Sequence, residues 1–219
     1  LNDEKVGSEA KVLLKDAKYM LKKIIDENLL SINGVYGIFP ANSENESINI
    51  FSEINPKQKL ETLIHIRQQI IKRKGQFNYC LSDFIKSNGD YVGAFAVMVG
   101  PEVKSICEKF ESEQDDYSSI MIKVLADRLA EAYAEKLHED VRKNYWGYEK
   151  DENLTNDELI NEKYYGIRPA PGYPACPDHT EKEKLFRLLN VTKNIGLKLT
   201  ENFAMYPVSA VCGWYFSHP

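Results

Sequence analysis

The chain has 219 residues, of which 43% are hydrophobic and 11% aromatic. This length and composition are typical of one large globular domain with a substantial core, rather than of two small ones. The 28 basic and 33 acidic residues are mixed along the sequence and give a net charge of −5. A basic stripe is therefore missing, and we expect no nucleic acid as a partner.

The hydropathy pattern argues against a membrane protein. The longest apolar stretch, Gly93 to Val99, is far shorter than the roughly 20 residues that a helix needs to cross a bilayer. No cleavable signal pattern opens the chain, so we expect no membrane partner and a cytoplasmic location. The four cysteines form no Cys-x-x-Cys pair and the four histidines have no ligand-like spacing, which predicts reduced thiols and no metal site.

The first third of the chain predicts a helix, a hairpin and a second helix. Apolar residues three or four apart over 9–30 indicate an amphipathic helix with one buried stripe. Residues 34–40 are typical of a strand ended by Pro40, and 47–51 of a half-buried strand joined to it by a polar turn. A second helix is expected over 60–71, with Gly75 as its stop. The first helix's stripe comprises Val12, Leu13, Ala17, Met20, Leu21 and Ile24.

A central strand and a long helical region follow. Residues 90–99 form the best candidate for a central strand. Pro101 can occupy the first turn of a helix, and helical periodicity continues to about Trp146, as two helices or one bent helix.

The last third of the chain predicts two short helices and a strand-rich end. Thr155 with Glu158 and Thr180 with Glu183 each match a capping box, so short helices are expected to begin there. Segments 197–205 and 210–217 are strand-like. Because strands and helices show no regular βαβ rhythm, we expect an α+β fold: a single domain with a twisted antiparallel sheet surrounded by helices.

The segment from Gly166 to His179 is neither helix nor inner strand, because four of the nine prolines fall within 169–177. Proline restricts the backbone, so such a loop loses little entropy on ordering, and we expect its carbonyl groups to point outward unpaired. Arg168 can bind a carboxylate, Gly172 permits close approach of another group, and Tyr173 offers a ring and a hydroxyl. A zwitterionic ligand fits this pattern as well as an ordinary proline-rich surface crossover does.

The run Arg168-Pro-Ala-Pro-Gly-Tyr-Pro-Ala-Cys-Pro177 resembles the Arg-x-x-x-Gly-Tyr signature of the activation domain of cobalamin-dependent methionine synthase. The resemblance covers nearly the whole chain. Its other segments are Gly34–Asn42, Asn78–Phe84, Asp90–Ala96, Ala126–Ala132, Asn202–Met205 and Gly213–Ser217.

The resemblance implies a function for the whole of residues 1–219. In this family the domain binds S-adenosylmethionine, whose methyl group restores methylcobalamin from inactive cob(II)alamin during methionine biosynthesis. The cobalamin is bound by another domain of the enzyme, a 5-methyltetrahydrofolate–homocysteine methyltransferase. The implied partners are that cobalamin-binding domain and a flavodoxin-like electron donor, and the isolated domain is not expected to be active alone.

The resemblance also implies site residues. Arg168 matches the arginine that binds the ligand's carboxylate, Ala170 and Gly172 match the backbone contacts, and Tyr173 matches the residue that shapes the pocket. Glu131 resembles an acid near the ligand's amino group, although exposed helical glutamates are common. We expect no catalytic residue, because a sulfonium needs nearby dipoles rather than a general base.

Two other functions stay open on the residues alone. One is a non-catalytic interaction module that docks on a cobalamin protein after losing its ligand site. The other is an independent methyltransferase, for which neither a glycine-rich Rossmann turn nor an acceptor-orienting base is found. The family places a further ligand-binding acid upstream of Leu1 and further aromatics downstream of Pro219, and we expect the chain to be truncated at both ends.

Overall fold

The two longest strands, β1 (Ile32–Glu44) and β4 (Asp90–Val99), pair antiparallel at the centre of a five-stranded sheet. The sheet order is β3 (Lys59–Ile64), β2 (Ser47–Phe51), β1, β4 and β7 (Ala210–Tyr215). This computed structural model describes residues 3 and 6–218, so the chain ends Leu1 and Pro219 lie outside the described residues. A second sheet pairs β5 (Lys198–Leu199) with β6 (Met205–Tyr206).

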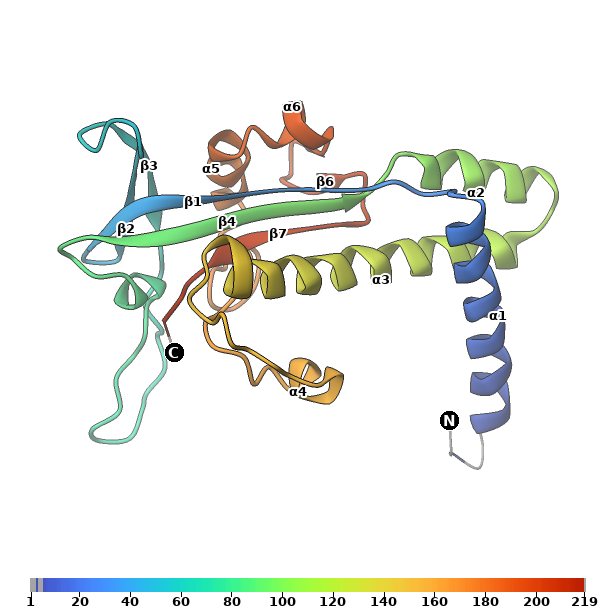
Figure 1. The fold of residues 1–219 in the computed structure, drawn as a ribbon, viewed down its shortest axis with the longest axis horizontal. Helices are drawn as coiled ribbons and strands as arrows, with labels where there is room; N and C mark the ends of the chain where they lie inside the picture. Colours follow the sequence, from blue (N-terminus) through green and yellow to red (C-terminus); the bar gives the residue numbers. More distant parts are fainter. Residues whose placement is uncertain (1–2, 4–5, 219) are drawn as a thin grey trace.

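Helices cover both faces of the main sheet (Figure 1). The long helix α3 (Asp116–Asp140) runs along one face, and α5 (Glu181–Leu188) and α6 (Val191–Ile195) pack on the other. This arrangement explains why β4 is buried continuously over Val92–Val99. Alternate residues point to opposite faces, and both faces of this strand meet helices. The predicted α+β fold, a single domain with an antiparallel sheet surrounded by helices, is confirmed.

The side chains of β4 divide between two cores. Ala94, Ala96 and Met98 join the core beneath α5 and α6, whereas Phe95 and Val97 join the core beneath α3. The small residues on the first face allow close packing of the bulky Trp214 from β7, which is fully buried.

Helix α1 (Gly7–Asp26) joins the core through its second half. Met20 and Ile24 are buried against α2 (Glu102–Ser112) and α3, but the first half of α1 projects away from the sheet (Figure 1). Val12 and Leu13 are 61% and 52% exposed. The predicted helix is confirmed, but the prediction that its whole apolar stripe is buried is wrong, because α1 crosses α3 rather than lying along it.

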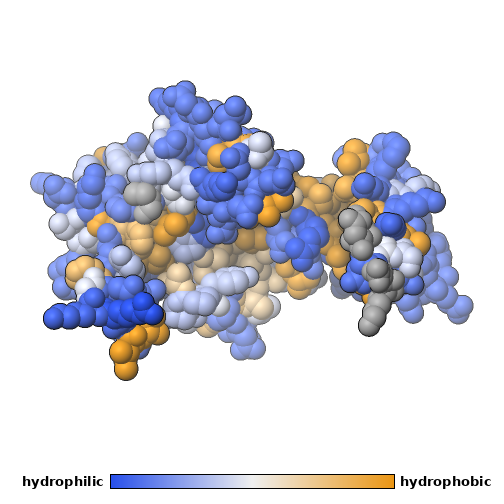
Figure 2. All heavy atoms as spheres, turned by 90° about the horizontal axis from the view of Figure 1, so that it is seen from below, coloured by the Kyte–Doolittle hydropathy of each residue, from blue (hydrophilic) through white to orange (hydrophobic). Residues whose placement is uncertain are grey.

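An apolar groove remains where α1 and α3 diverge. Its lining includes Leu13 and Leu14 from α1 and Ile120 and Val124 from α3. Figure 2 shows hydrophobic residues gathered on the face seen from below, beside the α1 end of the molecule.

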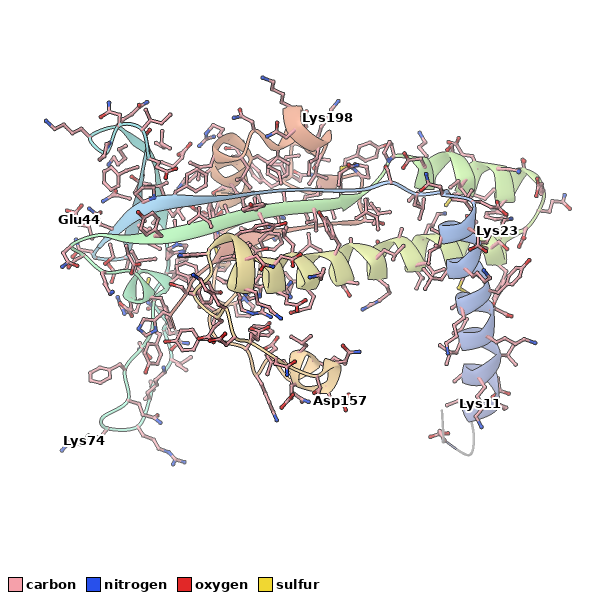
Figure 3. All side chains as sticks on the ribbon, in the orientation of Figure 1. Lys11, Lys23, Glu44, Lys74, Asp157 and Lys198 are labelled. Carbon is pink, nitrogen blue, oxygen red and sulfur yellow. The ribbon has the colours of Figure 1, made fainter. Side chains whose placement is uncertain are left out.

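The prediction of a helix over 60–71 is wrong. Residues 59–64 form β3, which pairs with β2 in the register Ile48↔Leu63, and an irregular loop follows. Figure 3 labels Lys74 near the end of this loop, which projects below the sheet. Leu63 is fully buried while Ile64 is 60% exposed. Pairing with β2 thus outweighed the helix-like spacing, because the strand buries Leu63 beside Ile48 of β2 and leaves Ile64 on the outer face.

Two predicted boundary signals differ from the structure. Pro40 does not end its strand: β1 continues to Glu44, because pairing with β4 extends past Pro40 to Ala41, where pairing with β2 begins. Helix α5 begins where predicted, but Thr180 makes no side-chain capping bond to the helix. Its amide and hydroxyl both donate to Asp178 instead, at 2.8 Å each.

Two other expectations are confirmed: the capping box at Thr155 and the long helical region that follows Pro101. Thr155 and Glu158 form a reciprocal capping box at the start of α4 (Asn156–Ile160). The long helical region consists of α2 and α3 followed by a π-helical turn, η2 (Val141–Tyr145). A short 3-10 turn, η1 (Leu81–Phe84), precedes β4. All four cysteines are reduced and buried. Among the described residues, no helix is both long enough and apolar enough to span a bilayer.

A buried histidine on the α3 side makes stability depend on pH. His138 stacks on Tyr215 with ring centroids 4.9 Å apart, and it is fully buried. Burial, together with the positive charges of Arg142 and Arg168, lowers the pKa of His138 from 6.5 to about 2. An unfolded chain therefore binds a proton on this residue below about pH 6.5 that the folded chain does not bind.

We predict that the free energy of unfolding falls as the pH drops from 6.5 to 5, with His138 contributing up to about 1.4 kcal/mol per pH unit. His138→Phe keeps an aromatic ring against Tyr215 and removes the titrating group. The slope should therefore become shallower by up to about 1.4 kcal/mol per pH unit, which corresponds to one proton. Urea titrations at several pH values measure the slope. An identical slope in the variant would show that His138 is protonated in the folded protein.

Candidate functional site

The proline-rich loop is attached to the free edge of the main sheet. The amide of Ile167 donates to the carbonyl of Phe216 at 3.0 Å, and the amide of Phe216 donates back at 3.1 Å. The amide of Trp214 donates to the carbonyl of Pro169 at 2.9 Å. The expectation of outward, unpaired carbonyls is therefore wrong at Ile167 and Pro169, because edge strand β7 offers its unpaired amides to the loop.

Gly213 in β7 permits this close approach. A Cβ atom on Gly213 would lie 2.7 Å from the carbonyl oxygen of Pro169 and 3.0 Å from the ring of Phe95. Any larger residue would push the loop off the sheet edge.

A tight turn follows the attached segment. The amide of Gly172 donates to the carbonyl of Cys176 at 2.7 Å, and the amide of Cys176 donates to Tyr173 at 2.9 Å. Cys176 is buried in the core beneath α5, which anchors the far side of the turn. Tyr173 at the turn is 67% exposed.

Two features of the turn require glycine at position 172: its backbone conformation and a close neighbouring side chain. Its φ is +100°, a conformation that favours glycine. A Cβ atom there would overlap the imidazole of His179, with Cε1 as the nearest atom. The close approach expected at Gly172 is therefore present, and the approaching group is the His179 imidazole.

Arg168 lies in the wall of a cavity of about 340 Å³. Glu162 and Tyr164 line the same cavity, so it combines a carboxylate, a guanidinium cation and a phenol with loop backbone. A second cavity of about 610 Å³ lies on the other side of the loop and includes Leu81 and Phe84 in its lining. Ile167 and Ala175 line both cavities and thus separate a polar space from a more apolar one.

The acid that pairs with Arg168 is Glu135. Nη2 of Arg168 lies 2.8 Å from Oε2 of Glu135, and the two side chains are 22% and 32% exposed. Glu131, one turn earlier on α3, pairs with Arg128 at 2.6 Å and is 55% exposed. The structure therefore joins Arg168 to α3 through Glu135 and places Glu131 in an exposed ion pair.

A fully buried ion pair lies beside this partly buried one. Arg142 is fully buried and forms two hydrogen bonds with Glu152, at 2.6 and 2.8 Å. Its guanidinium also lies 4.1 Å from the ring centroid of Tyr164. Both Arg142 and Arg168 contribute to the lowered pKa of His138, so the arginines share one electrostatic environment.

The local chemistry suits binding and not proton transfer. Burial raises the pKa of Tyr164, an effect to which the negative charge of Glu135 adds. Burial, with Glu181 and Asp178 nearby, raises the pKa of the Cys176 thiol to about 12, which leaves it protonated and a poor nucleophile. The groups gathered here can bind a charged ligand and orient it.

The structure brings only part of the predicted site together. Arg168 lines the polar cavity, while Ala170, Gly172 and Tyr173 form the adjacent turn. Glu131 is neither in that turn nor paired with Arg168. The sequence analysis missed Glu135 and His179. Glu135 lies four residues beyond Glu131, a helical spacing that suggests it as a second acid on the same face of α3.

The whole chain matches a known family. Residues 1–219 match the family model described as the activation domain of vitamin B12-dependent methionine synthase. The chain is also 53% identical to a solved structure described as the MetH reactivation domain bound to AdoHcy. The TM-score of that match is 0.95, and it covers 100% of this chain and 68% of the solved one.

The contact between Gly172 and His179 leads to a test of the turn. Gly172→Ala should destabilise the protein by about 1–3 kcal/mol, because the new methyl group meets both an unfavourable φ and the imidazole. Adding His179→Ala should recover the part due to the contact and leave the part due to φ. Thermal or urea denaturation of the single and double variants measures the coupling.

Gly75→Ala is the matched control for the backbone term. Its φ is +89° and a Cβ there would meet no atom within 4 Å. A double variant as unstable as the sum of both single variants would rule out the proposed coupling.

Proposed function

The chain belongs to the family of activation domains of vitamin B12-dependent methionine synthase, and from this membership we propose that its proline-rich loop binds S-adenosylmethionine. The observation that carries the proposal is Arg168 in the wall of the polar cavity, directly before the tight turn at Gly172. AdoHcy, which the similar solved structure contains, is S-adenosylmethionine without the transferred methyl group.

The residues present fit the ligand's amino-acid portion. A carboxylate needs a positively charged donor, and Nη1 of Arg168 has no hydrogen-bond partner among the residues that the structure describes. We assign Arg168 to the ligand's carboxylate, the Ala170 and Gly172 backbone to further contacts, and Tyr173 to the outer wall. The earlier assignment of Glu131 to the amino group stays a prediction.

The chain contributes position to the reaction. The methyl group of S-adenosylmethionine supplies the chemistry when it is held against reduced cobalamin, which we propose is carried by another domain of the same enzyme. Residues of the loop bind and orient the donor, because correct placement of two reactants removes much of the entropic part of the barrier. A general base is not needed for transfer from a sulfonium.

We place this activity within methionine synthase, a 5-methyltetrahydrofolate–homocysteine methyltransferase, and treat residues 1–219 as one activation domain. The partners are the cobalamin-binding domain and a flavodoxin-like electron donor, and the location is the cytoplasm. The isolated domain should transfer no methyl group, because the acceptor and the reductant are supplied by these partners.

Removal of the Arg168 guanidinium should weaken ligand binding. We expect Arg168→Ala to bind S-adenosylmethionine and S-adenosylhomocysteine about 10- to 100-fold more weakly, the usual effect of losing a charge-assisted hydrogen bond. Isothermal titration calorimetry measures both affinities. Arg187→Ala is the control, because Arg187 lies on α5 in a pair with Glu61. Unchanged affinity in Arg168→Ala would contradict the site.

Transfer to cobalamin provides the test of function. With the cobalamin-binding domain, a reductant and S-adenosylmethionine, the chain should convert cob(II)alamin to methylcobalamin, and Arg168→Ala should slow the conversion. The visible absorption of cobalamin reports the change. Equal formation of methylcobalamin without the chain would favour a non-catalytic interaction module that only docks on the cobalamin protein.

A further inference from the structure

Only one of the two terminal nitrogens of Arg168 forms a hydrogen bond to a described residue. Glu135 contacts Nη2 alone, at 2.8 Å. Nη1 of Arg168 and Oε1 of Glu135 are both shielded from solvent, and neither has a hydrogen-bond partner within the described part of the chain. A shielded donor without an acceptor is unfavourable in a folded protein, so this guanidinium is only half satisfied by the protein itself.

The acid that holds Arg168 is on a rigid element. Glu135 lies between Ala134 and Leu137 of α3, which are 1% and 5% exposed and belong to the core beneath that helix. His138, which lies one helical turn after Glu135, stacks on Tyr215 of β7. Because these neighbours fix the helix against the sheet, the carboxylate of Glu135 has a defined place relative to the loop on the β7 edge.

Electrostatic balance also requires Glu135. Arg142 and Arg168 both act on His138, and Arg142 has Glu152 as its own partner. Glu135 is the corresponding partner of Arg168. Without it, the loop arginine would lie near a buried histidine and another arginine with no negative charge bonded to it, and it would turn toward solvent.

A flexible arginine binds a carboxylate less well than one already in place. Its long side chain samples many rotamers, and part of this entropy is lost on binding. A pair made before the ligand arrives removes that loss from the binding step.

We propose that Glu135 is the positioning residue for Arg168: it holds Nη2 from α3 so that Nη1 remains for the carboxylate of the ligand. The inference rests on the proposed function of Arg168. It also requires a side chain of the cavity wall to turn aside on binding, since Nη1 is shielded from solvent.

The test compares ligands with and without the carboxylate. Glu135→Ala should weaken binding of S-adenosylhomocysteine about tenfold. It should leave binding of methylthioadenosine, which lacks the amino-acid portion, unchanged. Glu135→Gln keeps an acceptor oxygen for Nη2 and should lie between wild type and Glu135→Ala. A general structural defect would weaken both ligands alike, and calorimetry separates these cases.

A double variant connects Glu135 to Arg168. If Glu135 acts through Arg168, Glu135→Ala should cause no further loss when it is added to Arg168→Ala. Glu139→Ala is the matched control, because Glu139 lies one turn farther along α3 in partly exposed ion pairs with Lys136 and Lys143. Circular dichroism melting curves establish that each variant is folded, and Glu135→Gln, which is nearly isosteric, carries the test if Glu135→Ala does not fold.

The outcomes distinguish the two proposals. Unchanged affinity in Arg168→Ala would overturn the proposed ligand site itself. Weak binding in Arg168→Ala with normal binding in both Glu135 variants would overturn only the positioning role. Tighter binding in Glu135→Ala would also overturn it, because Glu135 would then compete with the ligand for the guanidinium.

Discussion

Three backbone hydrogen bonds connect the proline-rich loop to β7, two between Ile167 and Phe216 and one from Trp214 to Pro169. Proline supplies no amide hydrogen, yet this segment satisfies a sheet edge because Pro169 is used as an acceptor. The loop thereby becomes part of the sheet margin. Arg168, which lies between the two paired residues, acquires a fixed position and direction opposite α3.

Several polar groups are buried or partly buried where the end of α3 meets the loop. Arg142 with Glu152, Arg168 with Glu135, and neutral His138 lie beneath one helix end among tyrosine rings. Buried ion pairs add little net stability, since desolvation offsets much of their attraction. Such pairs fix geometry instead. Each arginine has one carboxylate partner, and a displaced charge would lose that partner and raise the free energy of the fold.

The turn after Arg168 differs in its construction from a glycine-rich Rossmann turn. A Rossmann domain uses glycines between a strand and a helix, whereas here Gly172 lies in a turn closed by hydrogen bonds to Cys176 and packed against His179. The turn is anchored on one side by the buried Cys176 and presents Tyr173 to solvent. The turn therefore has a rigid base and an exposed aromatic side chain.

Local signals in the sequence determined much of this fold. The central strand at 90–99 follows from apolar spacing, the helix after Thr155 from its capping box, and the loop over 169–177 from its proline content, and these signals act over a few residues. The same signals failed over 60–71, where pairing with β2 outweighed a helix-like spacing, and over the first half of α1, where no neighbour covers the apolar stripe.

The partners of the site residues were decided by tertiary structure alone. Arg168 and the loop turn could be recognised from their motif, but the choice of Glu135 over Glu131, one turn earlier on the same face, depends on where along α3 the loop meets the helix. The helix is held in that place by burial of Ala134, Leu137 and His138 against strands far away in the sequence. Likewise, the carbonyl of Pro169 is paired because β7 ends the sheet beside it. Contacts between distant segments form only when the whole chain packs, so no local pattern could predict them.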